Sequence, residues 1–415
     1  MKVRIHTTGC RTNQAESEAM AIDLEKHGFQ LVTQGIADIY ILNACTITAK
    51  AERHARNLIY RAKTENPNAF VVLAGCLATR LQRFAEPDFF RKQGPDLVIG
   101  NADKDGLTTL IVQRFAGQGA GNTVRSMGNR RLLKVQDGCS RNCAYCIVPL
   151  VRGPSRSIAP ESVLAGAREI RGSGASEIVL TGTHLGMYGR DLRPRMDLTE
   201  LIERILKTTD VPLLRLSSVE PEEAGMRMLE VFRRPRVAHH LHLPLQSGSD
   251  HVLREMNRPY TRQTFRNIVD AARHIAPDIA IGMDVIVGFP TETEADFGET
   301  VELVRTINPM YLHVFRYSPR PGTPAQKLKD PVPFQVKHHR SGILTKMSDE
   351  FRRGYIDRLI GSTIRAVFIR TRSDGMLEGL AENYVKVLYR GRTRTIAKVR
   401  VDARDRDYAI GVEVE

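Results

Sequence analysis

Three cysteines fall within eight residues in the middle of the chain, Cys139, Cys143 and Cys146, in the run Cys-Ser-Arg-Asn-Cys-Ala-Tyr-Cys. With three residues between the first pair and two between the second, one loop can turn three sulfurs toward one centre. A structural zinc ion usually takes four Cys or His ligands, and no fourth one lies nearby in the sequence. Three thiolates suit a four-iron cluster that keeps one iron open for an outside ligand. A partial zinc site, or cysteines placed by chance, is the alternative.

The other three cysteines each follow an expected strand in the first third of the chain. Strands are expected at Val3 to Thr8, Asp38 to Leu42, Phe70 to Ala74 and Asp96 to Ile99, with helices at Glu16 to Gly28 and Ala49 to Thr64. This alternation predicts an open parallel α/β sheet, whose strands end at one crevice. Cys10, Cys45 and Cys76 would meet there as a second three-cysteine site, and Gly9 and Gly75 favour close approach of a bulky group. Three buried core cysteines are the alternative.

Residues 128 to 355 alternate strand-like runs with helical patterns. Six runs stand out: Leu132 to Asp137, Ser176 to Thr183, Leu213 to Val219, His240 to Leu245, Ile279 to Phe289 and Met310 to Tyr317. Six βα units predict an incomplete barrel of the TIM type, in which the strand ends carry the chemistry. The loop that begins at Cys139 follows the first of these strands.

Residues 358 to 415 change to short β-rich runs with glycine turns. The runs are Ile364 to Arg370, Tyr384 to Tyr389, Arg394 to Val401 and Tyr408 to Val414, which predict a small antiparallel barrel. Five cations share parity, so that a strand pair would show them on one face: Arg390, Arg392, Arg394, Lys398 and Arg400. Phosphate binding is the functional interpretation, and a solvated strand face is the alternative.

The length and charge of the chain limit its organisation and its partners. A chain of 415 residues predicts two or three domains; we expect them at 1 to 118, 128 to 355 and 358 to 415, with a linker at Arg114 to Arg125. The net charge of +14 indicates a nucleic-acid partner. No run approaches eighteen apolar residues, so we expect no membrane span. Six cysteines without secretion signals predict a cytoplasmic setting with thiols as ligands.

Several short motifs give the chain a family resemblance. The run from Cys139 to Cys146 is similar to the CxxxCxΦC signature of the radical S-adenosylmethionine (SAM) enzymes. The strings Thr8-Gly9-Cys10-Arg11-Thr12-Asn13, Asn43-Ala44-Cys45-Thr46 and Ala74-Gly75-Cys76 resemble the N-terminal module of the methylthiotransferases in that superfamily. The resemblance covers nearly the whole chain. It implies one [4Fe-4S] cluster on Cys10, Cys45 and Cys76, a second on the Cys139 loop, and a C-terminal RNA-binding barrel of the TRAM type.

The family has three main branches, which modify isopentenyl-adenosine in tRNA, threonylcarbamoyl-adenosine in tRNA, or an aspartate of a ribosomal protein. Asn43 to Thr48, Val135 to Cys139 and Phe315 to Arg320 most resemble the threonylcarbamoyl branch. That resemblance implies methylthiolation of adenine C2 next to the anticodon. The chain departs from the branch pattern at Ile147 to Gly153. The other two branches, and a non-enzymatic iron–sulfur RNA-binding redox sensor, are the alternatives.

The resemblance also implies a division of labour. The reduced cluster on the Cys139 loop would cleave SAM to a radical that takes hydrogen from C2, while the N-terminal cluster offers sulfur and a second SAM supplies the methyl group. Candidate SAM contacts are Tyr145, Gly182, Glu220, Gly288 and Phe289, and candidate contacts to substrate phosphate or carboxylate are Arg316 and Arg320. Structural roles are the alternative for these residues. A flavodoxin- or ferredoxin-type reductant and a sulfur donor are expected partners.

Overall fold

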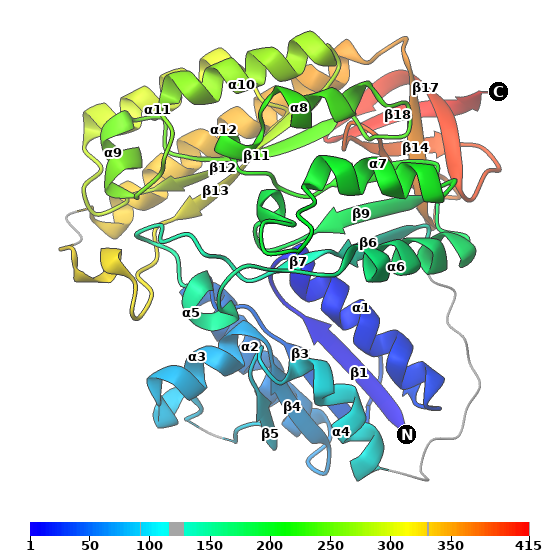
Figure 1. The fold of residues 1–415 in the computed structure, drawn as a ribbon, viewed down its shortest axis with the longest axis vertical. Helices are drawn as coiled ribbons and strands as arrows, with labels where there is room; N and C mark the ends of the chain where they lie inside the picture. The colour runs from blue at the N-terminus through cyan, green and yellow to red at the C-terminus, as the bar shows by residue number, and fades with distance from the viewer. Residues whose placement is uncertain (92, 116–127, 330–331, 415) are drawn as a thin grey trace. The chain divides into compact units, whose positions relative to one another are not determined.

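The computed structural model describes residues 1–91, 93–115, 128–329 and 332–414. Its contacts divide the chain into two compact units (Figure 1). Unit 1 holds Met1–Ser126, Asp137–Arg156 and Ser318–Gln326, and unit 2 holds Met127–Gln136, Ser157–Tyr317 and Lys327–Glu415. The Cys139 loop therefore belongs to the same unit as the N-terminal third. Residues 116 to 125 of the expected linker lie outside the described residues, and the three-domain division remains a prediction.

Unit 1 is built on a five-stranded sheet in the order β2-β1-β3-β4-β5, with every neighbouring pair parallel. The strands are β1 (Lys2–Thr7), β2 (Gln30–Leu31), β3 (Ile39–Asn43), β4 (Phe70–Ala74) and β5 (Leu97–Ile99). All residues of β3 are buried, as expected for a parallel strand that is covered on both faces. The four predicted strands and the parallel sheet are confirmed; β2 was missed because it has only two residues.

Helices cover both faces of this sheet: α1 (Arg11–Lys26), α2 (Ala49–Glu65), α3 (Cys76–Phe84) and α4 (Leu107–Arg114). Alternating side chains of β3 decide which helix packs where. Ile39 and Ile41 belong to one buried cluster with α1 and α4, while Tyr40 and Leu42 belong to another with α2 and α3. The result is a three-layer α/β unit, the arrangement that the sequence predicts.

Unit 2 contains six parallel strands in chain order. They are β6 (Arg130–Lys134), β9 (Glu177–Thr181), β10 (Leu213–Leu216), β11 (His240–Gln246), β12 (Ala280–Val287) and β13 (Tyr311–Arg316). They form two three-stranded sheets, β10-β9-β6 and β11-β12-β13. An isolated parallel bridge between Ser218 and His242 links β10 to β11. Six consecutive βα units are thus confirmed, and their closure into a TIM-like partial barrel remains a prediction.

Helices alternate with these strands. They are α6 (Pro160–Gly172), α7 (Leu198–Thr208), α8 (Met226–Leu229), α9 (Asp250–Glu255), α10 (Arg262–Ile275), α11 (Glu294–Ile307) and α12 (Phe334–Arg358). Capping boxes fix two of the helix starts, Asp197 with Glu200 at α7 and Thr293 with Asp296 at α11. Their apolar faces and the outward side chains of the strands share the largest buried cluster of the chain. Among the described residues, no helix combines the length and apolar character that a membrane crossing requires.

The last part of unit 2 is a closed five-stranded barrel in the order β14-β15-β16-β18-β17. Its strands are β14 (Thr363–Thr371), β15 (Leu377–Ala381), β16 (Lys386–Arg390), β17 (Ile396–Asp405) and β18 (Tyr408–Val414). Four of the predicted strand positions are confirmed, and β15 was missed. The barrel is not purely antiparallel as expected, because β16 and β18 pair in parallel.

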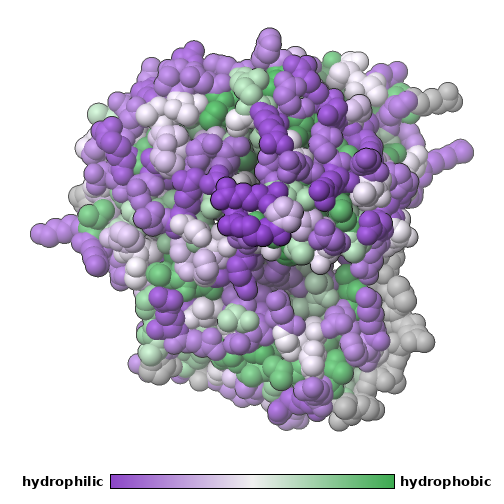
Figure 2. Space-filling model, viewed as in Figure 1, coloured by the Kyte–Doolittle hydropathy of each residue, from purple (hydrophilic) through white to green (hydrophobic). Residues whose placement is uncertain are grey.

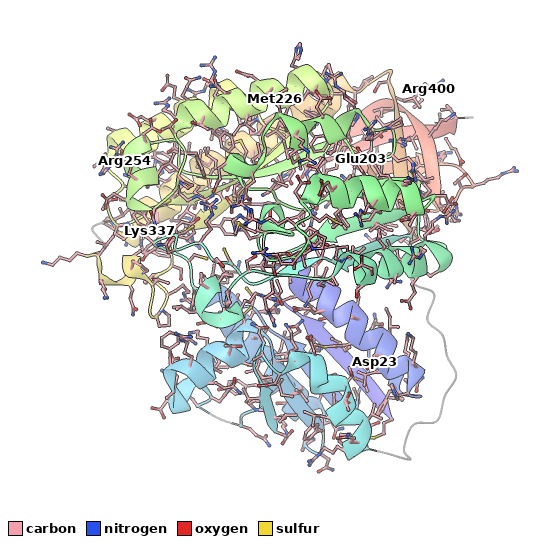
Figure 3. The ribbon with its side chains drawn as sticks, in the orientation of Figure 1. Asp23, Glu203, Met226, Arg254, Lys337 and Arg400 are labelled. Carbon is pink, nitrogen blue, oxygen red and sulfur yellow. The ribbon has the colours of Figure 1, made fainter. Side chains whose placement is uncertain are left out.

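Hydrophilic side chains dominate the molecular face in Figure 2, and Figure 3 places Arg400 on β17 and Lys337 on α12.

Candidate active site

The N-terminal cysteine site consists of Cys10, Cys45 and Cys76. Cys10 caps α1 just after β1, Cys45 follows β3, and Cys76 opens α3 directly after β4. Because β1, β3 and β4 are adjacent and parallel, the three residues come to the same edge of the sheet. This confirms the convergence that the sequence predicts. All six cysteines of the chain lie among the described residues, and none is in a disulfide.

Two glycines leave room at this edge. Gly9 and Gly75 have φ angles of +100° and +90°, which side chains rarely adopt. A Cβ added at Gly9 would overlap the Cys45 side chain and would lie 2.9 Å from its Sγ atom. A Cβ added at Gly75 would lie 3.2 Å from the carbonyl oxygen of Ala44. The glycines therefore permit the tight turns that bring the three thiols together.

The thiol of Cys45 is strongly shaped by this environment. Burial and the neighbouring Cys76 and Cys10 raise the pKa of Cys45 to about 12, although the backbone N–H of Ile47 donates to its Sγ at 3.4 Å and opposes that shift. Three mutually repelling thiolates need a cation to hold them together. An iron–sulfur cluster provides that positive charge, and the thiolate donor set is the one that such clusters take. The residues present therefore fit the group.

The loop cysteines Cys139, Cys143 and Cys146 lie between β7 (Gln136–Asp137) and α5 (Val148–Arg152). Short backbone bonds shape the loop: the N–H of Cys139 donates to Gly153 O and that of Cys146 donates to Cys143 O, both at 3.0 Å. The N–H of Arg141 donates to the Cys139 sulfur at 3.4 Å. Cys143 is buried and the other two are partly exposed. Three thiols on one such loop fit a cluster that stays open on one side.

The end of this loop packs on the N-terminal site. Ile147 and Val151 share a small buried cluster with Cys76. Asn101, which follows β5, donates through Nδ2 to the Cys76 sulfur at 3.5 Å and to Val151 O at 2.7 Å. The two cysteine triples therefore belong to one packed unit, and Asn101 links Cys76 to α5, the helix that follows the cysteine loop.

A buried charge network braces the same junction. Arg152 donates to Glu16 at 3.0 Å and to Asp137 at 2.6 Å, and it also bonds Asn13. Lys104 pairs with the same Glu16. Burial lowers the pKa of Lys104 against the pull of Glu16, whereas Cys76, Glu16 and Asp137 outweigh burial and raise the pKa of Arg152. Two cations thus lie within electrostatic reach of Cys76. No role for Arg152 or Lys104 was inferred from the sequence.

The candidate SAM contacts of unit 2 lie at or beyond strand ends. Gly182 follows β9 and packs closely against Gln136. A Cβ added at Gly182 would lie 2.8 Å from the Oε1 atom of Gln136. Glu220 is paired with Arg258; burial raises the pKa of Glu220, and the guanidinium opposes this shift. The sequence analysis missed Arg258, whose signal is only the run Asn257-Arg258-Pro259 after a helix.

Gly288 and Phe289 directly follow β12. Gly288 has a φ of +74°, and an added Cβ would overlap the Lys337 side chain. Phe289 is fully buried and packs edge-on against Tyr317, with ring centroids 5.5 Å apart. Tyr145 of unit 1 is partly exposed in the cysteine loop. Roles of these residues in SAM binding remain predictions, and Phe289 has a clear packing role besides.

The two candidate substrate arginines differ sharply in environment. Arg316 is exposed at the end of β13 and lies over the Phe334 ring at 5.1 Å. Arg320 is buried, forms an ion pair of 2.8 Å with Glu52 and donates to Thr46 O at 3.2 Å. Arg320 therefore holds the segment that follows Cys45, while Arg316 presents its charge to solvent. Contact of either with substrate remains a prediction.

The five cations of the terminal barrel are all exposed: Arg390, Arg392, Arg394, Lys398 and Arg400. Arg390 on β16 and Arg400 on β17 both pair in register with Val412 of the intervening β18, so they share one face. Lys398 and Arg400 alternate with buried Val399. Arg390, Lys398 and Arg400 thus lie on strands as predicted, but Arg392 and Arg394 do not, because they fall in the loop between β16 and β17. We call the five exposed cations the barrel cation face, and RNA binding by it remains a prediction.

Two family models match successive parts of the chain. Residues 2–100 match the model described as "Uncharacterized protein family UPF0004", and residues 133–304 match the radical SAM superfamily. Threonylcarbamoyladenosine tRNA methylthiotransferases MtaB of Aquifex aeolicus and Thermotoga maritima are 34% and 36% identical to the chain, covering 97% and 100% of it and 100% and 97% of their own lengths. The chain belongs to the radical SAM tRNA methylthiotransferases, of the MtaB type.

Members of the family with another substrate are also similar. A tRNA-2-methylthio-N(6)-dimethylallyladenosine synthase of Endomicrobium trichonymphae is 30% identical over 96% of both chains. Among solved structures, the radical SAM methyltransferase TsrM of Kitasatospora setae, with cobalamin and a [4Fe-4S] cluster bound, superposes with a TM-score of 0.54 at 13% identity, covering 78% of this chain and 76% of that one. At such identity the match supports the fold alone. As a member of this family, the protein is a sulfur-transferring tRNA-modifying enzyme.

Proposed function

We propose that the protein methylthiolates C2 of N6-threonylcarbamoyladenosine next to the anticodon of tRNA, using SAM and two [4Fe-4S] clusters. The observation that carries this proposal is the pairing of two cysteine triples in one compact unit, Cys10, Cys45 and Cys76 beside Cys139, Cys143 and Cys146. The choice of substrate rests on the relatives named MtaB, which are 33–36% identical to the chain. Isopentenyl-type adenosine is the second candidate, because relatives of 30–33% identity are named for that substrate.

Two cysteine triples suit two tasks that a single cluster could not perform at once. A radical SAM cluster supplies one electron to SAM and so gives access to an unactivated C–H bond, while a second cluster offers sulfur. The chain's own residues hold these groups by thiolates and keep them close through Asn101, Arg152 and Glu16. Burial of Cys45, Cys76 and Cys143 excludes water from the thiolate ligands. Positioning and exclusion of side reactions are therefore the protein's contribution.

Docking of tRNA is assigned to the barrel cation face, in a barrel of the TRAM type. Its five cations are exposed on the last part of unit 2, and each neutralised phosphate releases counterions from the RNA. A flavodoxin- or ferredoxin-type reductant and a sulfur donor complete the reaction, because neither electrons nor sulfur come from SAM.

The substrate is tested by mass spectrometry of tRNA nucleosides from a strain that lacks the gene. We expect the 2-methylthio derivative of threonylcarbamoyladenosine to vanish, and to return with the wild-type gene. Persistence of this nucleoside, with loss of the methylthio-isopentenyl one, would instead assign the second substrate.

The division of labour is tested with reconstituted protein in which Cys10, Cys45 and Cys76 are replaced by Ala. We expect this variant to keep about half of its iron and to release 5′-deoxyadenosine from SAM, but to form no thiolated product. The matching variant at Cys139, Cys143 and Cys146 should release none. If neither the wild type nor either variant cleaves SAM, the protein is an iron–sulfur RNA-binding sensor rather than a radical enzyme.

A further inference from the structure

The sheet β11-β12-β13 has one aliphatic face and one face that carries polar side chains. Leu241, Leu243, Met283, Val285 and Leu312 lie in the buried aliphatic cluster. The residues that alternate with them include His242, Asp284 and His313. Asp284 pairs in register with His313, and His242 pairs with Gly282, two residues before Asp284. Side chains two residues apart on a strand share a face, so three metal-binding side chains meet on three adjacent strands.

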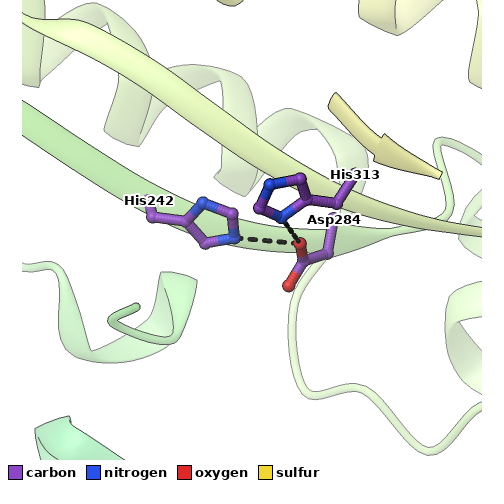
Figure 4. Close-up of side chains that lie close together, drawn as sticks. All are labelled: His242, Asp284 and His313. Atoms are coloured by element: carbon purple, nitrogen blue, oxygen red, sulfur yellow. Dashed lines mark hydrogen bonds and ion pairs between the residues drawn. The ribbon is translucent and has the colours of Figure 1, made fainter. Parts of the chain in front are cut away.

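These three side chains converge on one carboxylate oxygen (Figure 4). Oδ1 of Asp284 lies 3.0 Å from Nε2 of His242 and 3.1 Å from Nδ1 of His313. The candidate ligand atoms of all three residues lie within 4.8 Å of one another. Ligand atoms about 2.1 Å from a shared cation, at angles of about 90° to 110°, are about 3.0 to 3.4 Å apart. Two of the three separations already match, and the third is within 4.8 Å.

A further set of contacts orients the buried imidazole. The other ring nitrogen of His242, Nδ1, lies 2.8 Å from the Tyr311 hydroxyl, which also lies 2.9 Å from Nε2 of His240. Gly282 makes room for this phenol, because an added Cβ would overlap the Tyr311 ring. Metal-binding histidines are commonly held in this way through their second nitrogen, which fixes the ring and the tautomer. Nε2 of His242 is thereby aimed at Asp284.

The three side chains become more exposed in the order His242, Asp284 and His313. The His242, Asp284 and His313 side chains are 9%, 23% and 54% exposed. A cation would enter from the His313 side and keep open positions there. Two imidazoles and one carboxylate on one side of an ion are the donor set of open Fe²⁺ sites, and they also suit Zn²⁺ and Mn²⁺. This nitrogen and oxygen set differs in kind from the two thiolate triples.

The geometry points to a third metal centre, in which His242, Asp284 and His313 bind one divalent transition-metal ion and Tyr311 positions His242. The inference stands on the contacts within unit 2 and does not depend on the proposed substrate. Its functional consequence is a Lewis-acid position within strands β11, β12 and β13, able to take a carboxylate or carbonyl oxygen of a bound molecule.

The test is equilibrium dialysis of full-length, cluster-loaded protein against Zn²⁺, followed by elemental analysis. With the thiols occupied by iron, we expect about one Zn²⁺ per chain and an affinity at least about a hundredfold lower in His313→Ala. His313 is half exposed, so this variant should fold. The matched control is His239→Ala. His239 forms a similar pair of 2.9 Å with Asp278, but no third metal-binding side chain joins this pair among the described residues, so its loss should leave Zn²⁺ binding unchanged.

Two further measurements separate an ion site from a purely hydrogen-bonded cluster. Tyr311→Phe removes the hydroxyl but no ligand, and should weaken Zn²⁺ binding by about 10- to 100-fold. Co²⁺ bound at this site should show weak visible bands without the near-ultraviolet charge transfer that thiolate ligands produce. Equal Zn²⁺ content in wild type and His313→Ala, no Zn²⁺ in either, or a thiolate-type Co²⁺ spectrum would each overturn the inference and leave the three residues as a hydrogen-bonded cluster.

Discussion

At the residue scale, Arg152 is the side chain on which the paired cysteine triples most depend. Its side chain is 2% exposed and bonds acids from two distant segments, Glu16 of α1 and Asp137 at the start of the cysteine loop. A buried guanidinium is stable only when acidic groups balance its charge. Here the pairs with Glu16 and Asp137 also fix the position of the cysteine loop relative to α1. Lys104 shares Glu16, so removal of Arg152 leaves Asp137 without this charge partner and the thiolates with one cation fewer.

Replacement of Arg152 by Met should therefore destabilise unit 1 by about 3 to 5 kcal/mol, because it removes one buried counter-charge from Glu16 and Asp137. Hydrogen exchange of the α1 amides measures this free energy of opening. The control is Arg227→Met, whose exposed pairs with Asp197 and Glu200 are worth no more than about 1 kcal/mol. A loss of stability below about 1 kcal/mol in Arg152→Met would show that the buried charge network does not stabilise unit 1.

The raised pKa of Cys45 predicts an unusual pH dependence of its alkylation in cluster-free protein. With a pKa of about 12, its thiolate fraction rises about 100-fold from pH 8 to pH 10, against about tenfold for a thiol with an ordinary pKa near 9. The neutral thiol of the folded state also favours folding below pH 9, and this contribution is lost as the pH rises from 9 toward 12. Mass spectrometry of iodoacetamide-labelled peptides reports the rate, and urea-unfolded chain is the control. A tenfold rise in the folded protein would contradict the expectation.

At the element scale, the junction of β4 and α3 turns on Gly75. Its φ of +90° and its closeness to Ala44 O leave no place for a Cβ. Gly75→Ala should destabilise unit 1 by about 1 to 3 kcal/mol and lower the iron content by up to about half, since Cys76 begins the helix at that point. Thermal unfolding and iron analysis measure both effects. Gly106→Ala at the start of α4, where φ is −85° and no atom lies within 4 Å of the added Cβ, should change neither.

Elements with a strong pattern were predictable from the sequence. The apolar runs of β3 and β4 and the βα alternation gave the parallel sheets, and strand order then placed Cys10, Cys45 and Cys76 at one edge. The short helix α3 was missed although Leu77, Leu81 and Phe84 mark one apolar face, and the strand β15, Leu-Glu-Gly-Leu-Ala, was missed because it lacks an alternating pattern. Pairings such as Arg152 with Glu16, 136 residues apart, depend on tertiary packing that no local pattern encodes.

At the scale of the whole molecule, a net charge of +14 attracts RNA wherever it is distributed. What distinguishes a docking surface is cation charge that no acid neutralises and that a rigid scaffold presents together. The closed barrel provides the scaffold, because register pairs align Arg390 and Arg400 on either side of Val412. Arg400 pairs with Asp402 at 2.9 Å, which partly neutralises its charge. Arg390, Arg392 and Arg394 are therefore the better choice for a test.

Charge reversal of these three arginines to Glu should weaken tRNA binding and flatten its dependence on salt. Loss of three phosphate contacts lowers the slope of log K against log salt by about 2 to 3. Binding is measured by a titration of tRNA at several salt concentrations. The matched control is reversal of Arg227, Arg233 and Arg234, which changes net charge equally but removes cations that already pair with acids. If both triples flatten the slope alike, attraction is a property of overall charge; a larger change for the barrel triple identifies it as the docking surface.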